Sequence, residues 1–311
     1  MDLTARQELV LTDAEFRMYC ELFRGHCGLH FGPDSRFLLE KRLARRVCEL
    51  DLGSFAAYHY LLESDASGDR ELSHIIDELT TNETYFFRER NQLRALIDEI
   101  LPELRARREG LAPTPVSIWS AGCSSGEEPY SVVMMALEAG FEPGRDLRVY
   151  ASDISRKMLQ KARRGEYRPA SFRDTAPEIQ KKYFTERDGH WRISDDVKRH
   201  VVFTHLNLLD RARIALLGTM DVILCRNVII YFDLETKTRV IKTFEEKLRP
   251  GGYLLLGHSE SLINITSAFE LCHLRNDMVY RRPRRGENPR DPWHAAAAAA
   301  VARADGEGGR S

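Results

Sequence analysis

A strand, a glycine-containing turn and a helix follow one another directly in the segment VSIWSAGCSSGEEPYSVVMMA, Val116 to Ala136, and this order leaves few folds open. The apolar run Val116 to Trp119 is typical of a buried parallel strand. Gly122 and Gly126 permit a sharp turn, and the helix is expected to begin near Glu127 with its free backbone N–H groups facing that turn. The segment predicts an α/β fold with a ligand-binding turn.

The chemistry of this turn limits the ligand. Glu127 and Glu128 stand at the helix start, where a phosphate would be repelled and a neutral or cationic ligand accepted. The spacing G-x-x-x-G matches neither the dinucleotide motif G-x-G-x-x-G nor a Walker A loop. A plain strand-to-helix connection, in which the acids only complement the helix dipole, is the alternative. The turn thus predicts a site for something other than a pyrophosphate.

A second strand, RVYASDIS from Arg148 to Ser155, contains Asp153 at its carboxyl end. An acid at this place in a doubly wound sheet can accept both hydroxyls of a ribose. Helix capping by Asp153 or Ser155 is the alternative, and we favour the ribose role. Further apolar segments with polar ends follow at Val201 to Asp210, Asp221 to Asp233 and Gly251 to Ser261. Five strands are therefore expected to present polar ends at one edge, where open α/β sheets bind ligands.

Five motifs in this order resemble those of the chemotaxis receptor methyltransferases, the CheR family, over roughly residues 12 to 283: TTNETYFFRE (80–89), SAGCSSGEEPYS (120–131), ASDIS (151–155), CRNVIIYFD (225–233) and GGYLLLGHSES (251–261). The resemblance implies a class I methyltransferase, with a Rossmann-like doubly wound sheet and an antiparallel end hairpin, preceded by a small all-α domain. It also implies a cytoplasmic enzyme that uses S-adenosylmethionine to methylate glutamate side chains of chemoreceptor cytoplasmic domains, leaving S-adenosylhomocysteine.

The resemblance further implies which residues form the site. It assigns catalytic or substrate-orienting roles to Arg88 and Tyr231. An ionised glutamate is already a nucleophile at neutral pH, so groups that orient it are needed rather than a general base. No ligand spacing around His205 or His258 indicates a metal. Together with Gly122 of the turn, the expected donor-binding residues are Asn82, Thr84, Arg88, Glu127, Glu128, Asp153, Asn207, Leu208, Arg226 and Asn227, and the sequence does not choose between Glu127 and Glu128.

Charge, cysteine usage and hydropathy argue against a nucleic-acid enzyme, a secreted protein and a membrane-spanning protein. The net charge of −1 provides no general electrostatic field for a polyanion, and RNVI stands where a nucleic-acid methyltransferase would be expected to have an N-P-P-Y-like motif.

Six cysteines without a C-x-x-C pair, and no expected secretory leader, predict reduced thiols in the cytosol. No apolar run approaches the roughly 18 residues that span a membrane. We expect a monomer without nucleic-acid or membrane partners.

The periodicity of apolar residues divides the chain. Residues 1–90 predict a helical domain with caps at Thr12, Ser35, Ser54 and Asp69. Residues 91–115 predict a linker helix and a proline-containing connection. Residues 116–283 predict the methyltransferase domain, which ends in a hairpin around Arg275 to Asp277. The tail, residues 284–311, is predicted to be disordered.

The second predicted helix carries a concentration of positive charge that would suit an acidic helical acceptor. An ordinary solvated helix face is the alternative, but the implied glutamate-bearing receptor bundle favours a role in steering and orienting the substrate. The basic residues are Arg36, Lys41, Arg42, Arg45 and Arg46, against the single acid Glu40.

Residues 183–203 interrupt the alternation of strands and helices. We expect a small β-insertion in which HWRIS (190–194) turns back to pair with RHVVF (199–203). Some members of the family that the chain resembles bind a receptor's C-terminal pentapeptide with such an insertion. The short turn ERDGH has a single glycine, so we predict receptor recognition without that tether.

Two other functions remain as alternatives. One is an S-adenosylmethionine-dependent methyltransferase for a different acceptor. The other is a non-catalytic module that senses S-adenosylmethionine, which the presence of both Arg88 and Tyr231 disfavours.

Overall fold

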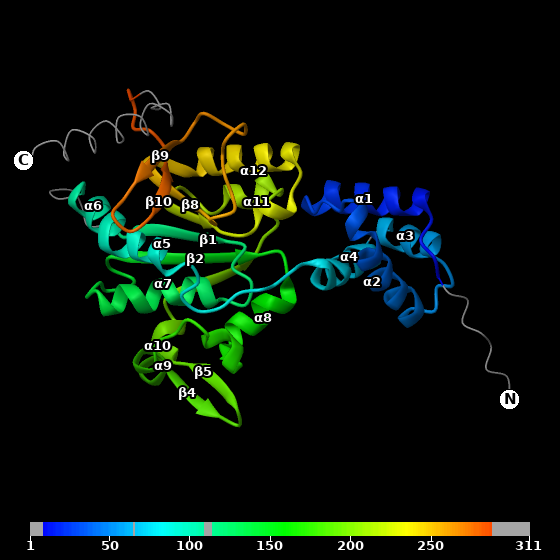
Figure 1. Cartoon of the computed structure of the whole chain (residues 1–311), viewed down its shortest axis with the longest axis horizontal. Helices are drawn as coiled ribbons and strands as arrows, with labels where there is room; N and C mark the ends of the chain where they lie inside the picture. Colours follow the sequence, from blue (N-terminus) through cyan, green and yellow to red (C-terminus); the bar gives the residue numbers. More distant parts are fainter. Residues whose placement is uncertain (1–8, 65, 109–113, 288–311) are drawn as a thin grey trace, which may run out of the picture.

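The computed structural model describes residues 9–64, 66–108 and 114–287, and its N-terminal part is entirely helical. These helices form a group at one end of the molecule (Figure 1). Their apolar side chains enclose a separate core that includes Tyr19, Phe23, Leu43 and Tyr58. The predicted all-α domain is confirmed. Its elements are α1 (Asp13–Cys27), the 3₁₀ helix η1 (Pro33–Ser35), α2 (Arg36–Glu49), α3 (Phe55–Glu63) and α4 (Ala66–Leu79).

Two of the four predicted helix caps form hydrogen bonds. Thr12 and Glu15 make a reciprocal capping box at the start of α1, and the Ser54 hydroxyl accepts from the backbone of α3. Ser35 precedes α2 but its side chain makes no capping hydrogen bond. The expectation for Asp69 is wrong, because α4 already begins at Ala66 and Asp69 lies within its first turn.

The second part is built on a seven-stranded sheet in the order β6-β2-β1-β7-β8-β10-β9. The first five strands are parallel, and β10 is antiparallel to both of its neighbours. The predicted doubly wound sheet with an antiparallel end hairpin is confirmed. The strands are β1 (Val116–Ala121), β2 (Leu147–Asp153), β6 (Val201–His205), β7 (Met220–Cys225), β8 (Leu248–Leu256), β9 (Glu270–His273) and β10 (Met278–Arg281).

Helices cover both faces of this sheet, which explains why its central strands read as continuous apolar runs. Ile118 of β1 belongs to the core shared with α7 (Glu127–Glu138) and α8 (Arg156–Arg164). The next residue, Trp119, packs on the opposite face, with its ring 5.5 Å from that of Phe244. That second face is covered by α11 (Arg211–Ala215) and α12 (Leu234–Lys247). The helix α5 (Arg90–Ala95) continues through the π-helical η2 (Leu96–Ile100) into α6 (Leu101–Ala106), and apolar residues of these three elements belong to the first core, with Ile118.

A small subdomain lies below the sheet in Figure 1, and its strand pairing differs from the prediction. The strand β5 (His190–Ile193) pairs with β4 (Phe184–Arg187), not with the segment beginning at Arg199. The turn between them is Asp188-Gly189, and both residues have positive φ, which suits a two-residue hairpin. Val201 instead begins β6 of the main sheet. The remaining elements are β3 (Glu166–Tyr167), η3 (Pro169–Phe172), α9 (Pro177–Tyr183) and α10 (Asp195–Lys198), with strand order β3-β5-β4.

Parts of two predictions fall outside the described ranges. They are residues 109–113 of the predicted linker helix and connection, and residues 288–311 of the predicted tail. Within the described ranges, no helix has the length and apolar character needed to cross a membrane.

Candidate active site

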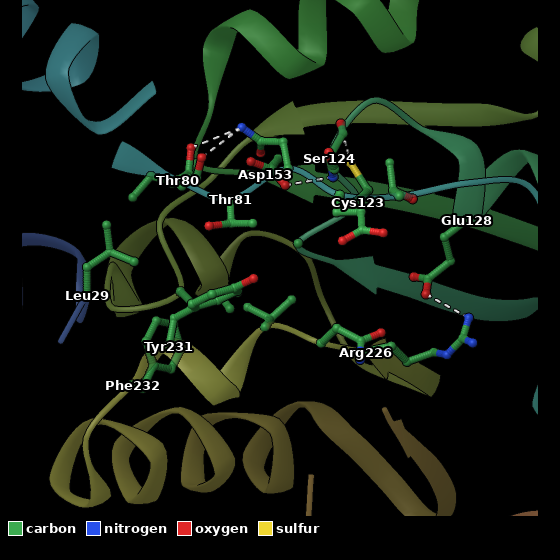
Figure 2. Close-up of a pocket in the computed structure, with 18 of the residues that line it drawn as sticks. Leu29, Thr80, Thr81, Cys123, Ser124, Glu128, Asp153, Arg226, Tyr231 and Phe232 are labelled. Carbon is green, nitrogen blue, oxygen red and sulfur yellow. Dashed lines mark hydrogen bonds and ion pairs between the residues drawn. The ribbon is translucent and has the colours of Figure 1, made fainter. Parts of the chain in front are cut away.

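A cavity of about 1050 Å³, part of it open to solvent, lies at the carboxyl ends of β1, β2, β6 and β7. Strand order reverses at β1, which makes this edge the expected ligand site of a doubly wound sheet. Residues 80–85 and Arg88, from the segment between α4 and α5, line one side, and Cys27 and Leu29 of the helical domain close another. Figure 2 shows Tyr231 and Arg226 on one side of the cavity and Ser124 and Asp153 on the other.

The turn after β1 requires glycine at its first position. Gly122 has φ +83°, and a Cβ there would lie 2.4 Å from a methyl carbon of Val228, which also lines the cavity. The backbone N–H groups of Gly122 and Cys123 both donate to the carbonyl of Ser152 at the end of β2 (2.8 and 2.9 Å). The turn is thus held against the neighbouring strand and close to the segment after β7.

Asp153 is buried at the cavity edge with both carboxylate oxygens engaged. Oδ2 accepts from the N–H of Ser124 (2.7 Å), and Oδ1 accepts from the N–H of Ser155 (2.8 Å). Burial raises the pKa of Asp153 to about 6, although these two hydrogen bonds oppose the shift. The cap of α8 is the hydroxyl of Ser155, which accepts from Met158, so the carboxylate of Asp153 is left to line the cavity.

The two adjacent acids of α7 point to different places. Glu128 lines the cavity, where it accepts from the Ser120 hydroxyl (2.6 Å). Glu127 is not among the cavity-lining residues. It is buried behind the turn, where it accepts from the hydroxyls of Ser125 (2.7 Å) and Ser171 (3.2 Å), and burial raises its pKa. Of the two acids that the sequence left open, Glu128 is therefore the one placed to meet a ligand, and the expectation that Glu127 also faces the site differs from the observed packing.

Arg226 joins the segment after β7 to two other segments. Its guanidinium pairs with Glu128 (3.1 Å) and Glu89 (3.2 Å) and donates to the carbonyl of Arg88 (2.5 Å). Arg226 is only 7% exposed, so this network lies away from bulk water. Two carboxylates surround one cation, and Asp153 adds a further acid at the cavity edge. The arrangement favours a ligand that carries positive charge.

Arg88 and Tyr231 reach the same cavity from segments far apart in sequence. One guanidinium nitrogen of Arg88 donates to the carbonyl of Glu83 (3.0 Å), and Arg88 has no ion pair within the described ranges. Tyr231 ends the 3₁₀ helix η4 (Ile229–Tyr231), and its hydroxyl has no hydrogen-bond partner in the part of the chain that is described. Both groups therefore have donor capacity available for a ligand or substrate.

The other predicted ligand contacts also line the cavity. They are Asn82, Thr84, Asn207, Leu208 and Asn227. Asn207 donates its side-chain N–H to the carbonyl of His26 (2.6 Å), which ties the end of β6 to the helical domain. Within the described ranges, the buried oxygens Oδ1 of Asn227 and Oγ of Ser124 have no hydrogen-bond partner. These two oxygens fit a ligand with polar groups, as an adenosyl amino acid has.

The helical domain contributes cavity residues that the sequence did not indicate. Leu29 forms an antiparallel bridge with Phe232, and the N–H of His30 donates to the carbonyl of Tyr231 (2.9 Å). Cys27 and Leu29 then face the cavity. No local pattern reveals such contacts between distant segments. Glu89, by contrast, belongs to the recognised motif TTNETYFFRE and could have been proposed as the partner of Arg226.

None of the basic residues of α2 lines the cavity. Arg36 is held by Asp13 and the carbonyl of Leu11, and Arg46 makes a two-point contact with Glu71. Arg42 is partly buried. Only Lys41 and Arg45 are exposed, one turn apart. Arg45 is itself paired with Glu49 of the same helix (2.9 Å). The five basic residues therefore do not form one free basic face, and a role in acceptor binding stays a prediction, carried by the exposed side chains of Lys41 and Arg45.

Within the described ranges, no group of three or more His, Cys, Asp or Glu residues could hold a metal ion. The six cysteines are unbonded to one another.

Two family models match the chain in succession. Residues 14–80 match "CheR methyltransferase, all-alpha domain", and residues 82–278 match "CheR methyltransferase, SAM binding domain". Chemotaxis protein methyltransferase 2 of Vibrio cholerae is 40% identical over 90% of this chain and 97% of its own length. The chemotaxis protein methyltransferase of Escherichia coli K12 is 36% identical over 89% of this chain and 94% of its own length.

A solved structure, magnesium protoporphyrin IX methyltransferase of Synechocystis with bound SAM, is 18% identical, with a TM-score of 0.32 over 62% of this chain and 78% of that one. A likeness of that size carries no inference about the site.

Proposed function

Since this chain belongs to the CheR methyltransferase family and is an S-adenosylmethionine-dependent methyltransferase, we propose that its acceptors are glutamate side chains of chemoreceptor cytoplasmic domains. The products would be glutamate methyl esters, which serve chemotactic adaptation, and S-adenosylhomocysteine. We further propose that the protein acts in the cytoplasm as a monomer. The observation that carries the proposal is the juxtaposition of Arg88 and Tyr231, both with free donors, at a cavity whose lining also includes the carboxylates of Glu83, Glu128 and Asp153.

The donor side of the cavity suits the parts of S-adenosylmethionine. Asp153 would accept the ribose hydroxyls, and Leu208 would pack near the adenine beside Asn207. Glu128 would lie near the ammonium group of the amino acid end, and Asn82, Thr84 and Asn227 would supply polar contacts. S-adenosylmethionine brings an activated methyl group on a sulfonium. The negative excess around Arg226 would then favour the charged donor over its neutral thioether product.

The acceptor side needs orientation more than proton transfer. A glutamate side chain with an ordinary pKa near 4.3 is ionised at neutral pH. One of its oxygens forms the bond to the methyl carbon as the carbon–sulfur bond breaks, so positive and negative charge disappear together. Arg88 and Tyr231 can hold the other oxygen, and alignment of reacting groups can lower a barrier by up to roughly 7–11 kcal/mol. Donors that bound the carboxylate too tightly would slow its neutralisation.

The test is methyl transfer from labelled S-adenosylmethionine to receptor cytoplasmic fragments, followed by mild alkali. We expect label that is released as methanol and that disappears when the acceptor glutamates become alanines. Donor binding without transfer to any fragment of a receptor panel would rule out this acceptor class. Alkali-stable label would instead favour a methyltransferase for another kind of acceptor.

The affinity for S-adenosylhomocysteine should depend on the ionisation of Asp153. Ribose hydroxyls donate to the carboxylate, so affinity should be full above the pKa of about 6 and fall below it. Titration calorimetry should show affinity about tenfold weaker at pH 5 than at pH 8. His205 lies nearby, and burial lowers its pKa, so it is a competing source of pH dependence. Asp153→Asn is the control. If this weaker-binding variant still lost affinity for S-adenosylhomocysteine between pH 8 and pH 5, the pH dependence would not come from Asp153.

The exposed pair on α2 should act on acceptor binding alone. We expect Lys41→Glu with Arg45→Glu to raise the KM for an acidic receptor fragment about tenfold, because surface charge reversal weakens encounter. kcat and S-adenosylhomocysteine affinity should not change, since neither residue reaches the cavity. The matched control reverses two exposed cations of α12, Arg239→Glu with Lys242→Glu. Equal effects of the two double variants would show a general charge effect rather than a docking surface on α2.

A further inference from the structure

Glu260 is a buried carboxylate whose hydrogen bonds all go to backbone N–H groups. It follows β8 by a short turn and does not line the cavity. Its two oxygens each serve two donors, so the carboxylate brings the segment after β7 and the segment after β8 together. Oε2 accepts from Gly257 (2.7 Å) and Asn227 (2.8 Å), and Oε1 accepts from Val228 (2.9 Å) and Ile230 (3.3 Å).

The segment that Glu260 holds cannot satisfy these donors by itself. It enters the 3₁₀ helix η4 without a side-chain cap, so the first N–H groups of this short helix need acceptors from elsewhere. Asn227 has φ +59°, a left-handed conformation that tertiary contacts must maintain. Burial raises the pKa of Glu260, and the four N–H groups oppose that shift by stabilising its charged form. The carboxylate thus replaces the cap that the sequence around η4 lacks.

The same segment ends at Tyr231, whose carbonyl accepts from His30 on the other side. Glu260 and the helical domain therefore fix the two ends of η4. The neighbouring Gly257 leaves space for this packing, because a Cβ there would lie 2.7 Å from the side-chain nitrogen of Asn227. If the Glu260 carboxylate shifted relative to the four backbone N–H groups that it accepts from, the backbone at Tyr231 would move, and its side chain would move with it within the cavity.

We propose that Glu260 is a positioning residue for methyl transfer: by holding the backbone from Asn227 to Ile230, it sets where the Tyr231 hydroxyl meets the acceptor carboxylate. This inference rests on the proposed function, since it takes Tyr231 as a group that orients the acceptor. Glu260 contacts neither donor nor acceptor and acts through the backbone.

Glu260→Gln tests the proposal with little change in side-chain size. The amide leaves one acceptor oxygen, and its NH₂ group faces two N–H donors that it cannot satisfy. We expect kcat to fall about tenfold, because a small misplacement of an orienting group is enough for such a loss. Affinity for S-adenosylhomocysteine should weaken less than about threefold, since most of the cavity comes from other segments.

A double-mutant cycle separates positioning from a general structural effect. In a Tyr231→Phe background, Glu260→Gln should lower kcat by less than about twofold, because the hydroxyl that it positions is gone. An equally large decrease in both backgrounds would overturn the inference. So would a folded Glu260→Gln protein with the kcat of the wild type.

Glu270→Gln is the matched control, since Glu270 is also buried but pairs with Arg281 in the end hairpin. It should keep the wild-type kcat. Should the glutamine variant of Glu260 not fold, Glu260→Asp keeps the charge, withdraws the carboxylate by one methylene and should give the same pattern in the cycle. A wild-type protein inactive on receptor fragments would count against the proposed function, whereas an active wild type with an equally active Glu260 variant would count against the positioning role alone.

Discussion

Arg226→Met is expected to lower the free energy of unfolding by about 3–5 kcal/mol, because it leaves Glu89 and Glu128 without their shared cation in a buried site. The loss should appear as a decrease of roughly 5–15 °C in Tm. Methionine fills nearly the same volume, so cavity formation contributes little. Differential scanning calorimetry and chemical denaturation measure the effect. S-adenosylhomocysteine affinity should also fall, since the segments on two sides of the cavity lose their connection.

Arg249→Met is the matched control for this change. Arg249 pairs with the buried Asp221 (3.0 Å), but Asp221 also keeps Arg108 and the N–H of Ser117 as partners. Arg249 is itself half-exposed, so its removal should cost less than about 1 kcal/mol. Adding Glu128→Gln to Arg226→Met should restore part of the lost stability by removing one unpaired charge. Equal stability of wild type and Arg226→Met would mean that the buried network does not hold the cavity together.

Tyr231→Phe is expected to lower kcat about 10²-fold. A hydrogen bond to a charged group is worth about 1.5–3 kcal/mol, and each 1.4 kcal/mol corresponds to a factor of ten in rate. The hydroxyl has no partner in the described part of the chain, so its removal should leave Tm nearly unchanged. Initial rates at saturating donor and acceptor measure kcat, and calorimetry measures S-adenosylhomocysteine affinity, which should stay the same.

Tyr150→Phe controls for the loss of a hydroxyl, because Tyr150 is a half-buried tyrosine of β2 that does not line the cavity. It should retain wild-type kcat. If Tyr231→Phe retained it as well, the orienting role would pass to Arg88 alone. A decrease in kcat with an equal loss of donor affinity would point to a disturbed cavity rather than to a missing hydrogen bond.

The fold was largely predictable because its signals are local. Apolar runs such as Val116 to Trp119 are buried on both faces of the sheet, and Gly122 marks the turn that no other residue fits. The β4–β5 hairpin was also locally encoded, since Asp188-Gly189 is a two-residue hairpin turn, but the prediction gave that turn too little weight. Asp69 failed as a cap because α4 begins earlier, at Ala66, so that Asp69 lies inside its first turn.

Most of the residues predicted for the donor site do line the cavity, but the sequence did not give the orientation of their side chains. Glu127 and Glu128 are consecutive on a helix, so they point about 100° apart, and only the packing of α7 decides which of them faces the cavity. Arg36 and Arg46 looked available because their partners, Asp13 and Glu71, lie 23 and 25 positions away. The charge pattern of α2 does not show these partners in other segments, although Glu49 of the same helix, which pairs with Arg45 and Arg46, could have been read from the i, i+3 and i, i+4 spacing.

The bridge between Leu29 and Phe232 makes the boundary between the two domains a poor guide to where the enzyme can be divided. A fragment beginning after α4 would contain every motif of the methyltransferase fold, yet it would lack Cys27, Leu29 and the N–H that holds the carbonyl of Tyr231. Gly28 is fitted to this junction, since a Cβ there would lie 2.6 Å from a methyl carbon of Thr236. A chimera that takes its helical domain from a relative would therefore exchange residues that line the cavity along with the surface of that domain, so altered turnover in such a hybrid need not report altered recognition of the acceptor.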